Sequence, residues 1–177
     1  MLFRSITHQL RSNKAIDSAH ANINKFIKNG TELVKPMQRE LRFIMWKYCG
    51  VIKNRELLEK GLEEINALKN RLNYADIRIY ENSCEELASI FDLQSSLISA
   101  EASIVSALER KESRGAHQRS DYPETLSSCE YNCLISLNDE KNLLNITRSP
   151  LKKLTPKIYN LLQKEFRDDD VKDKLLE

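Results

Sequence analysis

Glycine and proline are scarce in this sequence of 177 residues, with only four of each. So few turn-forming residues argue against an all-β sandwich and favour long helices. The sequence also lacks the GxGxxG turn of a dinucleotide site, a phosphate-binding loop, the HExxH zinc motif and the nucleophile elbow of hydrolases. We therefore assign no catalytic or cofactor-binding residue to this chain.

Cysteines and histidines are also few, and they form no metal-binding pattern. No CxxC pair occurs, and the three histidines do not complete a zinc motif, so we predict no metal site. Free thiols are typical of a reducing compartment, which favours a cytoplasmic location, with Cys49 behaving as a small core residue. The four cysteines are Cys49, Cys84, Cys129 and Cys133.

Neither the charge nor the hydropathy points to nucleic acid or to a membrane. The formal net charge is +2, too small for nucleic-acid binding, which needs clustered Lys and Arg. No apolar run reaches the roughly 20 residues of a membrane span, and the N-terminus lacks the apolar stretch of a secretory signal. We expect no nucleic-acid partner and no direct membrane insertion, and we read the N-terminus as a helix start.

Four segments have the apolar spacing of helices. We expect the first to stop at Asn29-Gly30, because glycine accepts the left-handed conformation after a last turn. Pro36 opens the second, since its missing N–H is unpaired in a first turn anyway, and Gly50 ends it. Asn54 caps the third. The predicted helices cover residues 4–28, 36–50, 54–72 and 83–113.

The second helix carries the only tryptophan of the chain and is predicted to lie at the centre of the core. Leu41, Ile44, Met45 and Tyr48 form one face, which other apolar residues broaden. These broadening residues are Phe43 and Trp46. A tryptophan on an apolar-rich helix is expected to be buried. The alanines of the fourth helix leave room for a close neighbour, which indicates antiparallel packing in a bundle.

A different pattern follows the fourth helix. Residues 131–137 and 143–148 have the composition of two strands around a polar turn, which predicts a β-hairpin. Thr155-Pro156 caps a last short helix. The predicted fold is therefore mainly α: an antiparallel bundle of three to four helices, then a small β-hairpin and a short C-terminal helix. We expect residues 1–125 to form the helical bundle domain, with the hairpin and tail of residues 126–177 packed on it.

The densest polar run occupies residues 110–123 and reads RKESRGAHQRSDYP. Cations are favoured at a helix C-terminus by the helix dipole, so one interpretation is a charged helix end followed by a turn. Arginine forks also bind carboxylates of another domain, and His117 can donate across such an interface, so a docking surface is the alternative. A catalytic histidine is not supported, because no nucleophile or paired base accompanies it.

This run closely resembles a signature of the succinate dehydrogenase and fumarate reductase flavoproteins, of which L-aspartate oxidase has a related version. The matching positions are residues 110–117, Arg119 and residues 121–123. A second segment, residues 37–52, is similar to the part of those proteins that leads into their C-terminal helical domain. The two motifs occur in the family's order, and the resemblance covers roughly residues 30–155.

The resemblance implies that the chain is a C-terminal helical domain packing on an FAD-binding domain that oxidises or reduces dicarboxylates. No flavin-binding or catalytic segment of the family is present, so only the architecture carries over. An iron–sulfur subunit is a further candidate partner, and electron transport at a membrane surface, through a complex, is the implied setting. The resemblance implies interdomain contacts at five residues, namely Arg110, Arg114, His117, Arg119 and Asp121, although these side chains can equally serve only to order the turn.

Two alternatives remain open. A helical bundle can lose its enzyme and serve as a stand-alone interaction module, in which case residues 4–28 would present an apolar stripe to a partner. An independent enzyme is the weaker alternative, because the glycine-rich turn of a flavin site is missing.

Overall fold

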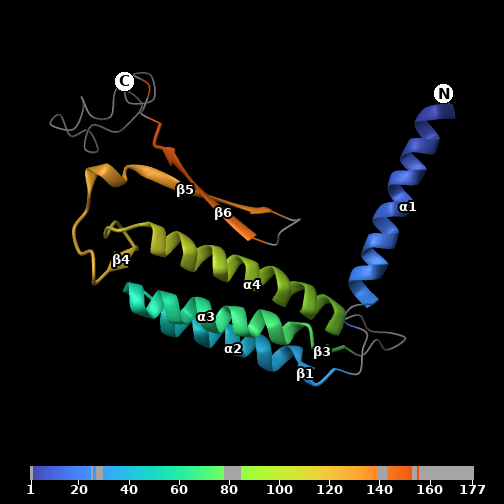
Figure 1. Cartoon of the computed structure of the whole chain (residues 1–177), viewed down its shortest axis with the longest axis horizontal. Coiled ribbons are helices and arrows are strands. Elements are labelled where there is room, and N and C mark those ends of the chain that lie inside the picture. The colour runs from blue at the N-terminus through green and yellow to red at the C-terminus, as the bar shows by residue number, and fades with distance from the viewer. Residues whose placement is uncertain are drawn as a thin grey trace. The chain divides into compact units, whose positions relative to one another are not determined.

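The computed structural model describes residues 2–24, 26, 30–77, 85–138, 143–152 and 155. The chain divides into two compact units, Met1–Thr125 and Leu126–Glu177. The first unit holds the four helices of the described residues: α1 (Leu2–Asn24), α2 (Val34–Tyr48), α3 (Arg55–Leu72) and α4 (Glu85–Glu109). The prediction of a mainly helical bundle followed by a hairpin is confirmed (Figure 1). The predicted C-terminal helix lies outside the described residues.

Helices α2, α3 and α4 pack on one another lengthwise and share one core (Figure 1). Each contributes one face, as the three-to-four-residue spacing of its apolar side chains predicts. Asn54 caps α3, as predicted, by accepting a hydrogen bond from the Leu57 N–H at 2.8 Å. Burying these faces supplies most of the stability of the unit. The largest fully buried apolar side chains are Met37, Leu58, Ile65, Leu68, Ile90, Leu93, Leu97 and Ile104.

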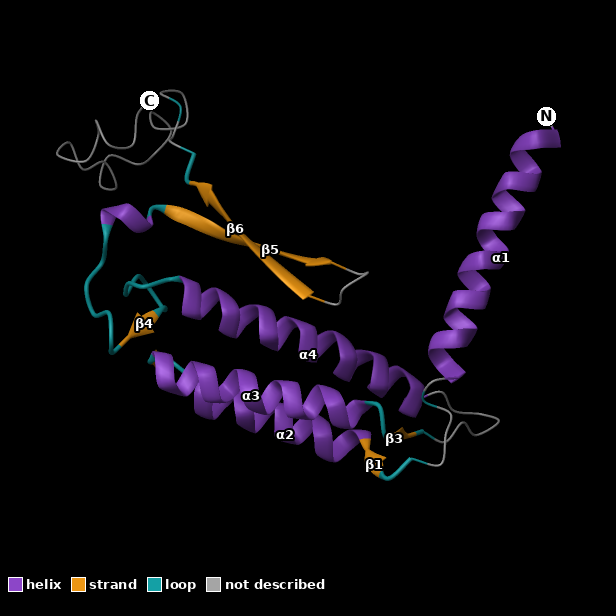
Figure 2. Cartoon of the chain, in the orientation of Figure 1, coloured by secondary structure: helices purple, strands orange, loops and turns teal. Residues whose placement is uncertain are grey.

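Two short parallel strand pairs close the two ends of the bundle (Figure 2). At one end β1 (Glu32–Leu33), which precedes α2, pairs with β3 (Ala75–Asp76), which follows α3. At the other end β2 (Ile52–Lys53), between α2 and α3, pairs with β4 (Gln118–Arg119), beyond α4. The second pair therefore fixes the polar run after α4 against the turn between α2 and α3.

The second unit contains the predicted hairpin. After a short 3₁₀ turn at Ser127–Cys129, β5 (Tyr131–Asn138) pairs antiparallel with β6 (Leu143–Pro150). The strands are slightly longer than predicted, and Ile135 lies opposite Ile146. Alternate residues of each strand share a face, so Ile135, Leu137, Leu144 and Ile146 fall on the same side of the hairpin.

The structure contradicts the predicted burial of two residues of α2 and the predicted ends of α4 and α1. The α2 side chains of Phe43 and Trp46 are not core residues, because they are 61% and 79% exposed on the face of α2 opposite Leu41 and Ile44. Helix α4 ends at Glu109 rather than at Ser113, because the following residues bond within their own loop.

Helix α1 ends at Asn24, and Gly30 is not in the left-handed region that a helix-ending glycine would adopt. Gly30 instead allows the backbone to approach the turn after α3, because an added Cβ would lie 2.3 Å from the carbonyl oxygen of Tyr74. Nearby, the buried ring of Phe26 packs edge-on against Phe91, with centroids 6.4 Å apart.

Candidate docking site at the end of the bundle

The polar run after α4 folds into a compact loop, which we call the signature loop (residues 110–125). Its tip is a tight turn in which the N–H of Arg114 donates to the carbonyl of His117 at 2.8 Å, and the reverse bond is 3.0 Å. Gly115 in this turn has a φ of +56°. Glycine is favoured there because a side chain in the left-handed region meets its own backbone.

Arg119 ties the signature loop to the end of α4. It is only 2% exposed, and its Nε and Nη2 atoms bind the two carboxylate oxygens of Asp121 at 2.8 and 2.7 Å. Its Nη1 atom donates to the carbonyl of Ala107 at 2.6 Å, and its guanidinium lies 5.0 Å from the ring centre of Tyr122. A buried cation is tolerated only when it is paired in this way. Arg119 therefore orders the loop from inside.

Ser113 is the second internal anchor of the signature loop. Its Oγ accepts from the N–H of Arg119 at 2.8 Å and donates to the carbonyl of Tyr122 at 2.9 Å. Its backbone N–H donates to the carbonyl of Glu124 at 2.9 Å, and its carbonyl accepts from the Thr125 hydroxyl at 2.6 Å. Ser113 thus joins both ends of the signature loop, which explains why α4 stops before Ser113.

Glu112 is a fully buried carboxylate between two arginines. Arg114 donates from Nε to Oε1 of Glu112 at 2.9 Å and from Nη2 to Oε2 at 3.1 Å. Arg110 also donates to Oε1, through its Nη1. The two-point fork fixes the direction of the Arg114 side chain, which stays partly exposed. Sequence reasoning missed Glu112 and Ser113 as site residues, because position within a charged run does not reveal which members are buried.

Asp121 connects the signature loop to α3. Its Oδ2 accepts a hydrogen bond at 2.9 Å from the N–H of Arg55, the first residue of that helix. The hydrogen bonds from Arg119, with a smaller contribution from the Arg55 N–H, lower the pKa of Asp121 from 3.8 to about 2. The carboxylate is therefore charged at neutral pH and suits the positive end of the α3 dipole.

His117 is half-buried at the loop tip. Its Nε2–H donates to the carbonyl of Arg110 at 3.3 Å, which leaves Nδ1 without the proton in the neutral ring. Burial lowers the pKa of His117, and the nearby cations Lys53, Arg119 and Arg110 lower it further. The ring is therefore mainly neutral at pH 7.

The structure brings all five predicted contact residues into this one loop, where they divide into two groups. Arg119 faces inward, Asp121 is bound to it, and the Arg110 side chain is mostly covered. Arg114 and His117 remain accessible at the tip, together with Lys111 and Gln118. Lys111, Arg55 and Tyr122 also line a small hollow of about 150 Å³ beside Arg119. This arrangement can receive the carboxylates or carbonyls of another protein surface.

Neither a glycine-rich turn between a strand and a helix nor a cluster of metal-ligating side chains occurs among the residues that the structure describes. Helix α2 begins directly after β1, and only Asn54 separates β2 from α3, so no glycine turn joins strand to helix there. Within the same residues, no group of three metal-ligating side chains gathers. Among the helices that the structure describes, none combines the length and the hydropathy that a membrane span requires.

The fold and the signature loop define a helical domain whose polar loop is held together internally. The model of the family described as "Fumarate reductase flavoprotein C-term" matches residues 38–172, and the chain belongs to this family. The succinate dehydrogenase flavoprotein subunit of Rickettsia felis is 32% identical over 136 residues, which are 73% of this chain and 22% of that protein. L-aspartate oxidase of Yersinia pestis is 36% identical over 91 residues, which are 50% of this chain and 16% of that protein.

Solved structures agree on the fold. The Mycobacterium smegmatis Sdh1 complex in its apo form superposes with a TM-score of 0.74 at 22% identity, over 91% of this chain and 27% of that chain. In these three comparisons the chain spans 16%, 22% and 27% of the length of the protein that it matches, which is about a sixth to a quarter.

Proposed function

We propose that this chain acts as the C-terminal helical domain of a succinate dehydrogenase or fumarate reductase type flavoprotein and packs on an FAD-binding domain. In this proposal the FAD belongs to the neighbouring domain, which carries out the oxidoreduction of a dicarboxylate. The observation that carries the proposal is the match of the family model to residues 38–172, most of the chain.

The signature loop is the proposed contact with the flavin-binding domain. Arg119, Asp121 and Arg110 hold the loop in shape through their internal bonds, and Arg114 and His117 at its tip meet the partner. A loop whose polar groups are already paired loses little conformational entropy on binding, so its accessible side chains are positioned in advance. Arg114 suits a carboxylate of the partner, because its guanidinium is planar and is already oriented by Glu112.

The proposal extends to the setting of the complex. An iron–sulfur subunit is a further partner of the assembled flavoprotein, with electron transport from the cytoplasmic side of a membrane surface as the role of the whole. This part rests on the named relatives, which include a succinate dehydrogenase flavoprotein subunit.

Binding to a flavoprotein lacking its own helical domain tests the proposal. The flavin-binding part of the Rickettsia felis relative would be prepared with FAD bound, as its visible absorbance shows, and titrated with the full chain. We expect a stable complex that the Arg114→Gln variant weakens by about tenfold or more. Lys60→Ala is the matched control, because Lys60 is an exposed cation on α3 that pairs only with Glu56 among the contacts described.

Two results would count against the proposal. Absence of any complex with the wild-type chain would remove the flavin-binding domain as the partner. Equal loss in the Arg114 and Lys60 variants would show that only overall charge matters, not the signature loop. Unfolding curves of both variants separate a binding effect from a folding effect.

A second candidate function is a stand-alone interaction module. One observation favours it: helix α1 precedes the matched region, and its described side chains from Asn13 to Asn22 are exposed. Deleting residues 1–24 should abolish partner capture if this function holds, and should leave binding to a flavin-binding domain unchanged if it does not.

A further inference from the structure

Four apolar side chains are exposed along the end of α2 and the segment that follows it, and we call them the Trp46 patch (Phe43, Trp46, Val51 and Ile52). Their exposed fractions are 61%, 79%, 69% and 70%. Phe43 and Trp46 are three residues apart and so lie on the same face of α2. Tryptophan exposed to this extent beside other apolar groups is unusual on a surface that faces only water.

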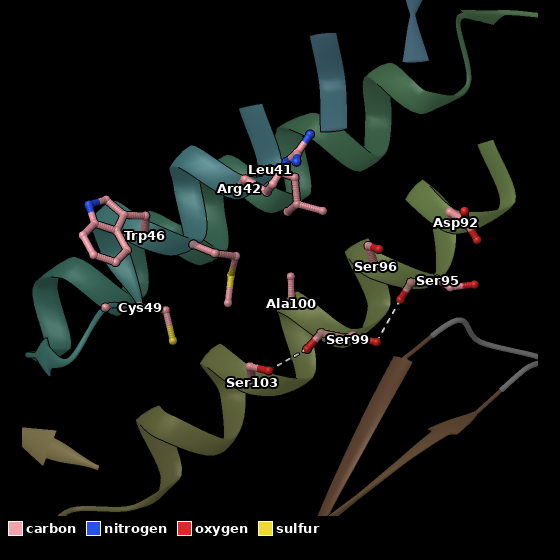
Figure 3. A pocket seen from close by; sticks show the side chains of 12 residues that line it. Leu41, Arg42, Trp46, Cys49, Asp92, Ser95, Ser96, Ser99, Ala100 and Ser103 are labelled. Atoms are coloured by element: carbon pink, nitrogen blue, oxygen red, sulfur yellow. Dashed lines mark hydrogen bonds between the residues drawn. The ribbon is translucent and has the colours of Figure 1, made fainter. Parts of the chain in front are cut away.

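A groove between α2 and α4 opens beside Trp46. It has a volume of about 840 Å³ and an apolar floor that includes Leu41, Met45 and Ala100 (Figure 3). Figure 3 shows Trp46 on one wall and a row of serines from α4 on the other. Ser99 and Ser103 donate to the carbonyls four residues earlier, at 3.0 and 2.8 Å, so these two hydroxyl protons are already engaged within α4. Such a groove suits the apolar side chains of a protein partner.

We propose that the Trp46 patch and this groove form the hydrophobic part of the interface with the flavin-binding domain, with Trp46 as its anchor. The inference rests on the proposed function and adds a second surface to it. Tryptophan is among the residues that contribute most to protein interfaces, especially when a pocket lies beside it.

The Trp46 patch is continuous with the signature loop. Ile52 belongs to β2 and pairs with Gln118 of β4, so the exposed Ile52 lies beside the loop tip. Ser120 strengthens this join, because its N–H donates to the carbonyl of Lys53 at 2.9 Å. A partner that contacts the loop therefore meets Ile52 and Val51 next, and Trp46 follows along the same chain segment. This continuity favours the flavin-binding domain over a separate partner.

The proportion of the relatives that this chain covers supports the same occupant. A unit that makes up about a fifth of a longer protein exposes, when alone, the faces that the rest of that protein would cover. The rim of the groove carries both signs of charge, since Arg42 and Asp92 border it, and the Lys47 ammonium lies 5.8 Å from the ring centre of Phe43. We therefore expect charged groups of both signs around the matching apolar surface of the partner.

Because Trp46 is the only tryptophan, it can report its own burial. The full chain would carry 5-fluorotryptophan and be titrated with the FAD-loaded flavin-binding part of the Rickettsia felis relative. We expect the ¹⁹F resonance to shift on binding, and we expect Trp46→Ala to weaken the complex by at least about tenfold. Tyr74→Ala is the matched control, because Tyr74 is 65% exposed but lies at the other end of the bundle, next to β3. It should change the affinity by less than about twofold.

The outcomes separate this inference from the proposed function. Binding with an unchanged ¹⁹F signal and an unaffected Trp46→Ala variant would overturn the Trp46 interface but leave the flavin-binding domain as partner. Absence of binding by the wild-type chain would overturn both. A free chain that self-associates through Trp46, so that Trp46→Ala becomes monomeric, would assign the patch to a second copy instead. The ¹⁹F readout needs no substitution, so it holds even if a variant folds poorly.

Discussion

The Oδ2 atom of Asp121 accepts a hydrogen bond from the backbone N–H of Arg55 over 2.9 Å, although 66 positions separate the two residues. The same carboxylate binds both nitrogens of the Arg119 fork. One side chain thus joins the start of α3, the signature loop and, through Arg119, the carbonyl of Ala107 at the end of α4. The shape of the proposed contact surface depends on this junction.

Replacing Asp121 by Asn should destabilise the first unit. The amide keeps the size of the side chain but leaves the buried guanidinium of Arg119 without its counter-charge, which typically costs about 3 kcal/mol of unfolding free energy. Urea unfolding followed by circular dichroism measures the change. Glu124→Gln is the control, because it removes an exposed carboxylate from the same loop and should shift stability by less than about 0.5 kcal/mol. Equal effects of the two substitutions would contradict the assigned role.

The Asp121 junction should also weaken in acid. Its folded pKa is about 2, against an ordinary 3.8, so the folded state holds this proton less tightly than the unfolded state does. The stabilisation is therefore complete above about pH 4 and is lost as the pH falls toward 2. Unfolding free energies of the wild type and of Asp121→Asn should converge over this window. A difference that stays constant down to pH 2 would show that the carboxylate is not the group responsible.

Gly61 allows α3 to approach α2 and α4 closely. An added Cβ would lie 2.7 Å from the Tyr48 Cβ and 3.0 Å from the Ile104 Cδ1. Alanine favours a helix over glycine by about 1 kcal/mol, but overpacking a core costs about 1–3 kcal/mol. Because Cβ of Tyr48 cannot move without its backbone, we expect Gly61→Ala to be destabilising overall. Thermal unfolding tests this, with Asn66→Ala on the exposed face of α3 as the control expected to be neutral or stabilising.

Local rules allowed much of the bundle to be predicted from the sequence. The cap at Asn54 and the apolar spacing of α3 follow from hydrogen bonding and periodicity within one helix, and the structure confirms both. The hairpin followed from strand-forming residues around a polar turn. These features depend on neighbours in the chain, so a single sequence contains the information.

The errors concern features that spacing within one segment does not determine. Periodicity counts Trp46 as a core residue, because residue type and spacing do not distinguish an exposed apolar side chain from a buried one. The early end of α4 depends on bonds from Ser113 to Tyr122 and Glu124, and the burial of Arg119 depends on β2, more than 60 positions away. Neither the end of α4 nor the burial of Arg119 can be predicted from spacing within the charged run.

The turn at Gly115 allows backbone strain to be tested without steric effects. Its φ is +56°, and an added Cβ would meet no described atom within 4 Å. Gly115→Ala should therefore cost about 1 kcal/mol of unfolding free energy from backbone strain alone. Gly115→Asn should cost less, because asparagine tolerates the left-handed region better. Chemical unfolding of the two variants compares them, and an alanine variant as stable as the wild type would mean that the turn adopts another conformation.

His117 should titrate below the ordinary value of 6.5, because burial disfavours its charged form and the cations Lys53, Arg119 and Arg110 add to that effect. The unfolded state then takes up the proton more readily, so His117 costs stability as the pH falls through 6.5. An NMR titration, with the His117 signal assigned by its loss in His117→Gln, gives the pKa directly. The stability difference between wild type and His117→Gln should also be less favourable to the wild type at about pH 5.5 than at about pH 7.5. A pKa at or above 6.5 would show that the ring is more exposed than in this structure or that a carboxylate lies beside it.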